Sequence, residues 1–288
     1  MEKNSHPMND IYSRQNEEQF LGLLRAFRCV YKFAKRLGVF LFVASALIPL
    51  AINVSFLLFD NPTVKSILCL IALSMVLIAF VLKEVIDYYK EIGALIQQQY
   101  DLLLFGIGDI STSDKSRIEK YVIKYGKNSF DKELNWYEDY SKLKDDLNIL
   151  CCQKENISWT SRLIDRYLLF VTVMVIVAFV PIIIDLIVFN SDINSILQLF
   201  YNTIPILTFS FYIIYKSINE RIRIARIKDY INFIFENVKK KRNIHEELKV
   251  LQNMIFDFRK SKRAIPDWLY NLFYKKDSLY EEIVSKNE

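Results

Sequence analysis

The chain has 288 residues, of which 52% are hydrophobic and 25% are charged, and its formal net charge is +5. Only 6 glycines and 6 prolines interrupt it, and apolar residues recur at alternating spacings of three and four, which excludes a strand-rich fold and predicts an all-α protein. The four cysteines, Cys29, Cys69, Cys151 and Cys152, form no disulfide framework.

Four apolar stretches without any charged residue divide the chain. An α-helix rises about 1.5 Å per residue and a bilayer core is about 30 Å thick, so about 17 to 25 apolar residues span it. We therefore predict two transmembrane hairpins, residues 37–82 and 168–215. Their predicted spans are residues 37–59, 64–82, 168–188 and 196–215.

Lysine and arginine lie almost entirely on one side of these spans. Residues 1–36 contain 7 of them, residues 83–167 contain 13 and residues 216–288 contain 17, whereas the short turn at 60–65 contains 1. Because cationic loops stay on the cytoplasmic side during insertion, both termini and the middle segment are expected to be cytoplasmic. Topology thus accounts for most of the positive charge, which leaves little to favour a polymeric nucleic acid as a partner.

Each span is expected to continue into the cytoplasm as an amphipathic helix, so that a four-helix membrane bundle extends into a cytoplasmic helical lobe. Ser158 and Thr160 are plausible caps just before the third span. Further helices are predicted at 115–125 and 244–259, the latter opened by a capping-box-like pair, Asn243 and Glu246. The predicted apolar seams are Phe20, Leu24, Phe27, Tyr31 and Ala34; Val85, Tyr89, Ile92, Ile96 and Leu103; Leu143, Leu147 and Leu150; and Ile224, Ile227, Ile231, Ile234 and Val238.

The residues offer little catalytic chemistry. Neither His6 nor His245 has a histidine or cysteine partner at metal-ligand spacing, and the chain has no Gly-rich phosphate loop or nucleophile elbow. We expect a protein that is not an enzyme and uses no cofactor. Cys151 and Cys152 are more typical of buried thiols on a helix face than of a redox pair or a lipidation site.

Polar residues inside the spans are better candidates for function. Asn53, Asp185 and Asn202 fall at comparable depth in the external half of the bilayer, where they either line a pore or form hydrogen bonds between helices. Two cationic runs, residues 239–242 and 259–263, are typical of contacts with acidic lipid headgroups or of solvated helix ends, and a phosphate-bearing ligand is the alternative. The nearby ring of Trp268 would stack on a base or form part of a docking face.

Two segments carry a resemblance to a known family. The sequence Ile11-Tyr12-Ser13-Arg14-Gln15-Asn16 with Leu24-Arg25-Ala26 near the start, and Leu251-Gln252, Arg259 and Ile265-Pro266-Asp267-Trp268 near the end, resemble the bacterial SMODS-associated four-transmembrane effectors. The arrangement of spans is similar along nearly the whole chain. The resemblance implies a pore-forming effector of CBASS-type antiphage defence in the bacterial inner membrane. Such an effector is encoded with a nucleotidyltransferase that makes a cyclic oligonucleotide.

The resemblance also implies partners and a binding site. The expected partners are the lipid bilayer, further copies of this chain, and either a cyclic oligonucleotide or an activated nucleotidyltransferase. For Arg14, Gln15 and Asn16 a structural role is equally open, in which Arg14 pairs with a carboxylate and the two amides cap or join helices. A scaffold or signalling subunit that forms no pore is the main alternative function, and a transporter is the third. The predicted ligand-binding residues are Arg14, Gln15, Asn16, Arg25, Arg259, Asp267 and Trp268.

Overall fold

The computed structural model describes residues 11–44, 48, 51, 61–130, 133–184, 193–240, 243–263, 265, 267–269, 271–273 and 279. Within these ranges every regular element is a helix, which confirms the all-α prediction. The predicted spans 37–59 and 168–188 lie partly outside these ranges. In the part of the chain that the structure describes, no helix is both long enough and apolar enough to cross a membrane.

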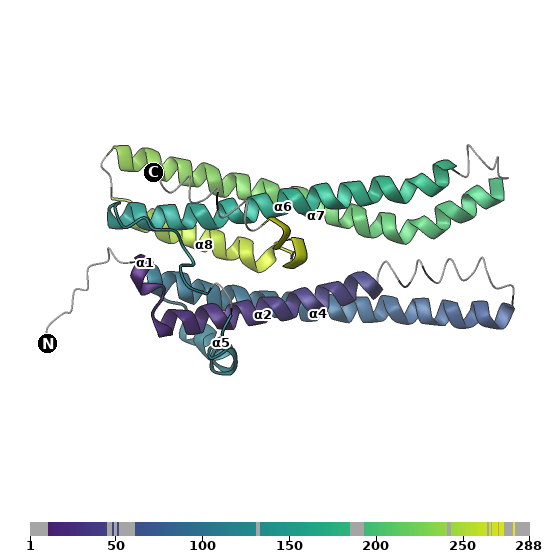
Figure 1. Cartoon of the computed structure of the whole chain (residues 1–288), viewed down its shortest axis with the longest axis horizontal. Helices are drawn as coiled ribbons and strands as arrows, with labels where there is room; N and C mark the ends of the chain where they lie inside the picture. Colours follow the sequence, from purple (N-terminus) through teal and green to yellow (C-terminus); the bar gives the residue numbers. More distant parts are fainter. Residues whose placement is uncertain are drawn as a thin grey trace.

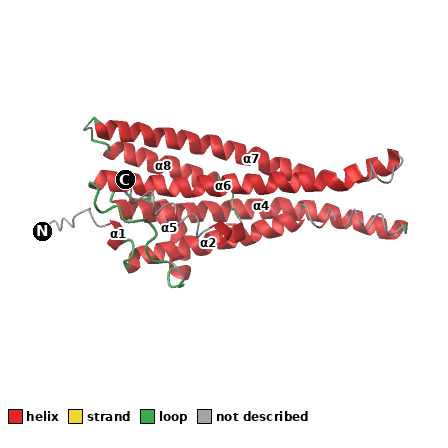
Figure 2. Cartoon of the chain, turned by 45° about the horizontal axis from the view of Figure 1, so that its top comes forward, coloured by secondary structure: helices red, strands yellow, loops and turns green. Residues whose placement is uncertain are grey.

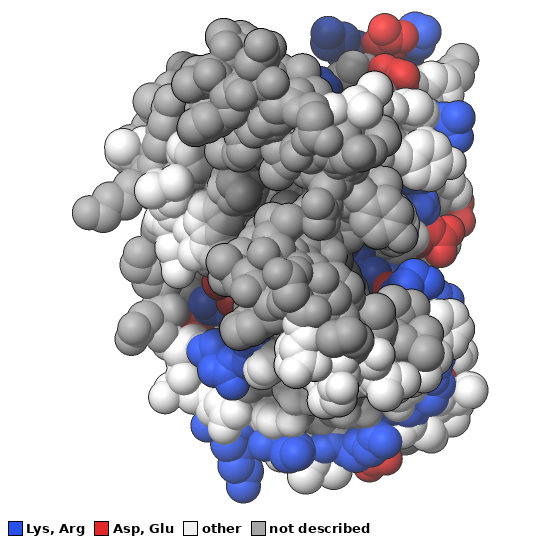
Figure 3. All heavy atoms as spheres, turned by 90° about the vertical axis from the view of Figure 1, so that its right-hand side faces the viewer, with Lys and Arg blue, Asp and Glu red and all other residues white. Residues whose placement is uncertain are grey.

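Two pairs of long helices lie lengthwise beside each other, α2 with α4 and α6 with α7 (Figures 1 and 2). The short helices α1 and α5 and the helix α8 all lie at one end of the molecule, with α8 between the two pairs (Figure 1). Seen from the opposite end, the nearest described atoms carry few charges, and Lys and Arg gather along the lower edge (Figure 3). The helices are α1 Ile11–Arg14, α2 Glu18–Phe42, α4 Pro62–Phe105, α5 Thr112–Tyr125, α6 Asp145–Ile184, α7 Ile193–Lys239 and α8 His245–Ser261.

Local sequence signals set the ends of α4 and α5. Asn61 caps α4 by accepting a 2.9 Å hydrogen bond from the backbone N–H of Thr63, and a proline follows at the first helical position. At the other end Gly106 adopts φ 67°, a left-handed conformation that glycine reaches without steric cost. Ser111 caps α5 by accepting a 3.1 Å hydrogen bond from the backbone N–H of Asp114.

Three residues predicted as caps, Ser158, Thr160 and Asn243, do not form the predicted caps. Helix α6 begins at Asp145 and continues without a break to Ile184, so Ser158 and Thr160 lie in its interior, where the Thr160 hydroxyl donates a 3.0 Å hydrogen bond to the backbone oxygen of Asn156. At the start of α8, Asn243 accepts a hydrogen bond from the backbone N–H of His245, whereas a capping box would need that of residue 246. The apolar faces of both helices determined their positions more strongly than these polar signals did.

Most residues of the predicted seams belong to the core or pack against it, with Val85 as an exception. Phe20, Leu24, Phe27 and Ala34 of α2 are buried, as are four isoleucines of α7, and all of them except Ala34 join one apolar cluster. Helix α8 contributes Leu248, Leu251, Ile255 and Phe258, which are all at most 1% exposed. It packs against α4, α6 and α7. Since each such side chain contributes about 1.5–3 kcal/mol by leaving water, α8 is the main link between the two helical pairs.

Candidate functional site

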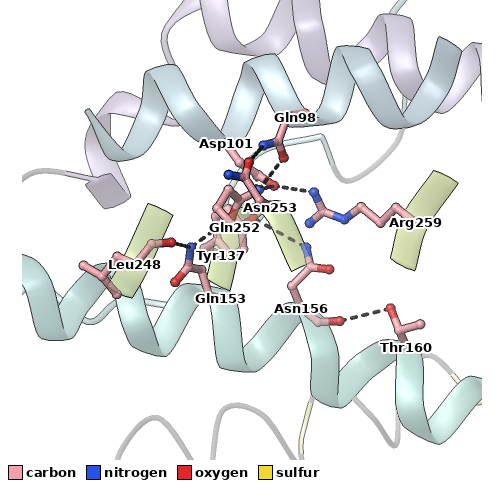
Figure 4. Close-up of polar contacts among 10 residues, drawn as sticks. All are labelled: Gln98, Asp101, Tyr137, Gln153, Asn156, Thr160, Leu248, Gln252, Asn253 and Arg259. Atoms are coloured by element: carbon pink, nitrogen blue, oxygen red, sulfur yellow. Dashed lines mark hydrogen bonds and ion pairs between the residues drawn. The ribbon is translucent and has the colours of Figure 1, made fainter. Parts of the chain in front are cut away.

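A buried carboxylate lies inside the end of the molecule that carries α1, α5 and α8, where α4 meets α8 (Figure 1). Asp101 is 0% exposed and accepts hydrogen bonds at both of its oxygens (Figure 4). Its Oδ1 accepts from the Tyr137 hydroxyl at 2.7 Å, and its Oδ2 accepts from the Arg259 guanidinium at 2.5 Å and from the Gln252 amide at 3.0 Å. Arg259, at 2% exposed, is the buried counter-charge.

Amide side chains extend this contact to α6. The Gln252 amide, besides reaching Asp101, donates to Gln98 Oε1 on α4 at 2.9 Å. From α6, the Gln153 amide donates to Gln252 Oε1 at 3.0 Å and to the backbone oxygen of Leu248 at 3.2 Å. Residues 248, 252 and 259 follow spacings of four and seven along α8, which place them close together on one helix face. We call Gln98, Asp101, Tyr137, Gln153, Gln252 and Arg259 the polar cluster (Figure 4).

Burial makes the charges of the polar cluster costly in free energy unless they are paired. Moving an ion pair out of water costs several kcal/mol per ion, and only close contact with further hydrogen bonds offsets that cost. The pKa of Tyr137 lies well above its ordinary value, because its hydroxyl is buried and because the charge of Asp101 opposes a second anion. The same two causes raise the pKa of Tyr100. At neutral pH both phenols are therefore neutral, and the Tyr137 phenol can donate to the carboxylate.

The polar cluster and two further buried tyrosines are only partly satisfied in their hydrogen bonds. Among the buried side-chain atoms that the structure describes, the hydroxyls of Tyr31 and Tyr100, Oε1 of Gln153 and Nε of Arg259 have no hydrogen-bond partner. Each such group costs about 1–3 kcal/mol relative to a paired one. These unpaired polar atoms weaken the contact between α4, α6 and α8 that the buried charges otherwise hold together.

The predicted ligand residues at the N-terminus fasten a loop. The Gln15 amide donates to the backbone oxygen of Tyr137 at 3.0 Å and accepts from its N–H at 2.7 Å, and Asn16 makes a similar reciprocal pair with Asn135. Arg25 binds Glu133 through two N–H groups at 2.8 and 2.9 Å. Together they hold residues 133–137, which bring Tyr137 into the polar cluster. Their role in binding a ligand stays a prediction.

Arg14 differs from the structural alternative that the sequence offered. Its guanidinium donates to the backbone oxygen of Leu103 at 3.2 Å and lies over the ring of Phe20. Among the residues that the structure describes, Arg14 contacts a backbone oxygen and an aromatic ring and not a carboxylate, and both contacts are structural. The contact ties the end of α1 to the last turn of α4.

The remaining predicted residues do not converge on one place. Arg259 belongs to the polar cluster, whereas Asp267 pairs with Lys35 of α2 at 2.5 Å and the ring of Trp268 packs on Phe170 with centroids 5.1 Å apart. Of the predicted pore-lining residues, Asn53 and Asp185 lie outside the described residues. Asn202 lies in α7, and the position of its side chain is outside the description.

In the cationic run at 259–263, two of the cations are neither solvated nor facing lipid, whereas the Lys260 side chain is 48% exposed. Arg259 is buried against Asp101, and Arg263 binds Glu220 of α7 at 2.9 Å and the hydroxyl of Ser217 at 2.5 Å. Two of its cations therefore act inside the fold. In the other run, residues 241 and 242 lie outside the described residues.

The interpretation of the paired cysteines is confirmed. Cys151 and Cys152 lie in α6 and are 2% and 0% exposed. Burial raises the pKa of the Cys151 thiol to about 11 and also raises that of Cys152. Both behave as core residues beside the polar cluster.

Most of the polar cluster was missed at the level of sequence. Gln98 and Asp101 come from one helix and Gln252 from another that is far away in the chain. Neither segment contains a sequence pattern that identifies the other as its partner. The available signal was an unusual stretch, the triplet at 97–99 followed by Asp101, within an otherwise apolar helix face. Polar residues on such a face require buried partners, and the facing helix supplies them.

These features define a class: an all-helical protein in which two long helical pairs are joined at one end by a central helix and a buried ion pair. The chain belongs to the family of SMODS-associating 4TM effector domains, whose model matches residues 9–282. This confirms the resemblance seen in the sequence. The chain is similar to a probable CBASS effector molecule from Bacillus cereus (strain VD146), with 26% identity over 282 residues that cover 93% of this chain and 94% of the relative. No solved structure matches the chain.

Proposed function

We propose that this protein is a membrane effector of a bacterial cyclic-oligonucleotide antiphage system and that it permeabilises the inner membrane when activated. The observation that carries the proposal is the family match over residues 9–282. The sequence of its relative is described as that of a probable CBASS effector. The four uncharged stretches and the one-sided distribution of Lys and Arg supply the membrane topology, with both termini cytoplasmic.

The lengths of the helices fit this topology. Helices α4, α6 and α7 contain 44, 40 and 47 residues, or about 60–70 Å each, which is roughly twice the thickness of a bilayer core. One half of each helix would lie in lipid and the other in the cytoplasm. The polar cluster, α5 and α8 all belong to the cytoplasmic half.

The proposal places the switch in the joint at α8. An effector that does not leak at rest needs two states, and a ligand shifts their balance only through its different affinity for each. A shift from 1:99 to 99:1 requires about 5.5 kcal/mol of differential affinity. The contacts of α8 involve free energies of this size, because a buried ion pair and its hydrogen bonds connect α8 to α4 and α6. A cyclic oligonucleotide or an activated nucleotidyltransferase would act on this cytoplasmic half, and several copies of the chain would surround the pore.

Expression in bacteria together with the cognate nucleotidyltransferase tests the proposal. We expect membrane potential, followed with a potential-sensitive dye, to be lost only when the synthase is active, and a catalytically inactive synthase serves as the control. A chain that binds the messenger or the synthase while the potential persists would instead be a scaffold. That result would refute permeabilisation.

A further inference from the structure

The chain continues beyond α8 in a segment that contacts both helical pairs. Helix α8 lies between the two pairs (Figure 1) and ends at Ser261. Of the residues that follow, the structure describes 262, 263, 265, 267–269 and 271–273. Ile265 and Leu269 are 6% and 2% exposed and belong to the apolar cluster. We call the described residues between 262 and 273 the post-α8 segment.

The post-α8 segment is bound firmly to α7 through Arg263. The backbone N–H of Arg263 donates to Glu220 Oε1 at 2.8 Å, and its guanidinium donates to Glu220 Oε2 at 2.9 Å. The guanidinium also donates to the Ser217 hydroxyl at 2.5 Å and to the backbone oxygen of Ile213 at 2.9 Å. The side chains of Arg263 and Glu220 are only 11% and 5% exposed. Opening a pair this buried leaves an unpaired charge away from water, so we expect this contact to persist.

Ring contacts bind the same segment to α6. The ring of Trp268 packs on Phe170 with centroids 5.1 Å apart. About one turn earlier in α6, the guanidinium of Arg166 lies 4.1 Å from the ring centroid of Phe273. The post-α8 segment therefore contacts both helices of the α6–α7 pair.

The contact with α2 is of a different kind. Asp267 Oδ1 accepts from Lys35 Nζ at 2.5 Å, and this is the one hydrogen bond or ion pair that joins the described residues of the segment to those of α2 or α4. The side chains of Asp267 and Lys35 are 46% and 27% exposed. An ion pair in contact with water is weak and is screened by salt. In its polar contacts the post-α8 segment is thus held strongly on one helical pair and weakly on the other.

This weak contact lies at a different level of α2 from the polar cluster. Phe27 of α2 packs on Tyr100, the residue before Asp101, with ring centroids 6.0 Å apart. From residue 27 to residue 35 the helix rises by about 12 Å. The contact at Lys35 can therefore open while the buried pair of Asp101 and Arg259 still ties α8 to α4.

We propose that the post-α8 segment is a latch, anchored on the α6–α7 pair by Arg263 and closed on α2 by the ion pair of Asp267 with Lys35. When this ion pair opens, the α2–α4 pair becomes free to tilt against the α6–α7 pair, while the segment stays on α7. The opening is local, and the chain remains folded. The latch goes beyond the proposed permeabilising function, and its test needs neither a messenger nor a membrane.

Exchanging the two charges tests the latch. Lys35→Glu and Asp267→Lys each bring two like charges together, whereas the double variant restores the pair in reversed order. Both side chains reach solvent, so no variant leaves a buried charge and each is expected to fold. Lys249→Glu is the matched control, because it breaks an exposed pair with Glu246 that lies within α8.

Distances between spin labels report which contact opens. Leu272→Cys places one label on the post-α8 segment, at a side chain that is 69% exposed. The second label is placed either on α2, at the exposed Lys32, or on α7, at Ile222, which is 47% exposed. The full chain is labelled in non-ionic detergent. Its cysteines outside α6 are replaced by serine, and the two buried cysteines of α6 stay.

The two label pairs should respond differently. We expect the distance from residue 272 to residue 32 to be narrowly distributed in the wild type and in Lys249→Glu, and to extend to longer values in each single charge variant. The open population should rise at least about threefold, the scale on which reversing one charge of an exposed pair acts. The double charge variant should restore the wild-type distribution. The distance from residue 272 to residue 222 should stay the same throughout, because Arg263 holds the segment on α7.

Three results would overturn the latch. The first is an unchanged distance between residues 272 and 32 in both single variants, and the second is a double variant that opens as the single variants do. The third is a longer distance between residues 272 and 222, which would show that the segment leaves α7 and not α2. None of these results depends on whether the chain permeabilises membranes, which the loss of membrane potential measures separately.

Discussion

Replacing Arg259 with methionine is the sharpest test of the joint between the helical pairs. The side chains of Arg259 and Asp101 are 2% and 0% exposed, so the substitution leaves a fully buried carboxylate without its cation. The carboxylate keeps its hydrogen bonds from Tyr137 and Gln252 but loses its shortest contact, at 2.5 Å. Breaking one side of a buried pair in this way costs about 3–5 kcal/mol, and we expect a loss of free energy of unfolding within that range.

The double variant makes the prediction specific. Asp101→Asn with Arg259→Met removes both charges while an amide oxygen remains to accept from Tyr137 or Gln252. We expect it to be at least about 2 kcal/mol more stable than Arg259→Met alone, which gives a coupling energy typical of directly interacting residues. Lys249→Met is the control on the same helix, because its partner Glu246 is 80% exposed and the loss of that pair should not be measurable.

The assay is guanidinium unfolding of each variant in non-ionic detergent, followed by circular dichroism and tryptophan fluorescence. The reasoning fails if Arg259→Met is as stable as Lys249→Met. It also fails if the losses of Asp101→Asn and Arg259→Met simply add in the double variant, because the two groups would then not form the energetic unit that the geometry indicates.

Three further outcomes follow from the described contacts. Gln15→Ala should lower the free energy of unfolding by about 2 kcal/mol, because it leaves both backbone groups of Tyr137 unpaired, and proteolysis should then cut the loop at 127–137 faster. Gly106→Ala should cost about 1–2 kcal/mol at φ 67°, and Gly106→Asn should cost less; thermal melting ranks the two. At pH 8, peptide mass spectrometry after brief alkylation of the folded protein should find the partly exposed Cys29 labelled and Cys151 unmodified, because burial raises the pKa of the Cys151 thiol to about 11. Labelling of Cys151 at the rate of Cys29 would contradict that burial.

The apolar pattern predicted the fold well because helical burial repeats along the chain. The seam from Phe20 to Ala34 in α2 and the seam from Ile224 to Ile234 in α7 are buried as the spacing indicated. Polar caps were less reliable, since Asn243 and Thr160 have side chains that hydrogen-bond in several local geometries. For such residues packing of the apolar face decides where the helix begins.

The site was predicted less well because it depends on contacts between distant segments. Arg259 was identified from the family resemblance, yet its partner Asp101 lies 158 residues away. Gln15 and Asn16 were expected to bind a ligand or to join helices, and the structure shows them holding the backbone of a loop 119 to 122 residues further along, a contact that the sequence did not reveal. A single sequence shows which polar residues need partners but not which partners they find.

The joint connects stability and the proposed function. Helix α8 contacts α4 on one side and α6 and α7 on the other, so a shift of α8 would change how the two helical pairs sit against each other. If such a shift opens the pore, variants that weaken the Asp101–Arg259 pair should permeabilise membranes without an activated synthase. The cluster would then set the threshold for activation.

Flux from lipid vesicles tests the central claim most directly. The purified full chain is reconstituted into vesicles that contain a self-quenching dye, and the reaction product of the cognate nucleotidyltransferase is added. We predict dye release that requires both the protein and the product, and that is absent when the synthase is inactive. Vesicles that retain their dye under these conditions, although the protein is shown to be inserted and to bind the product, would contradict the account.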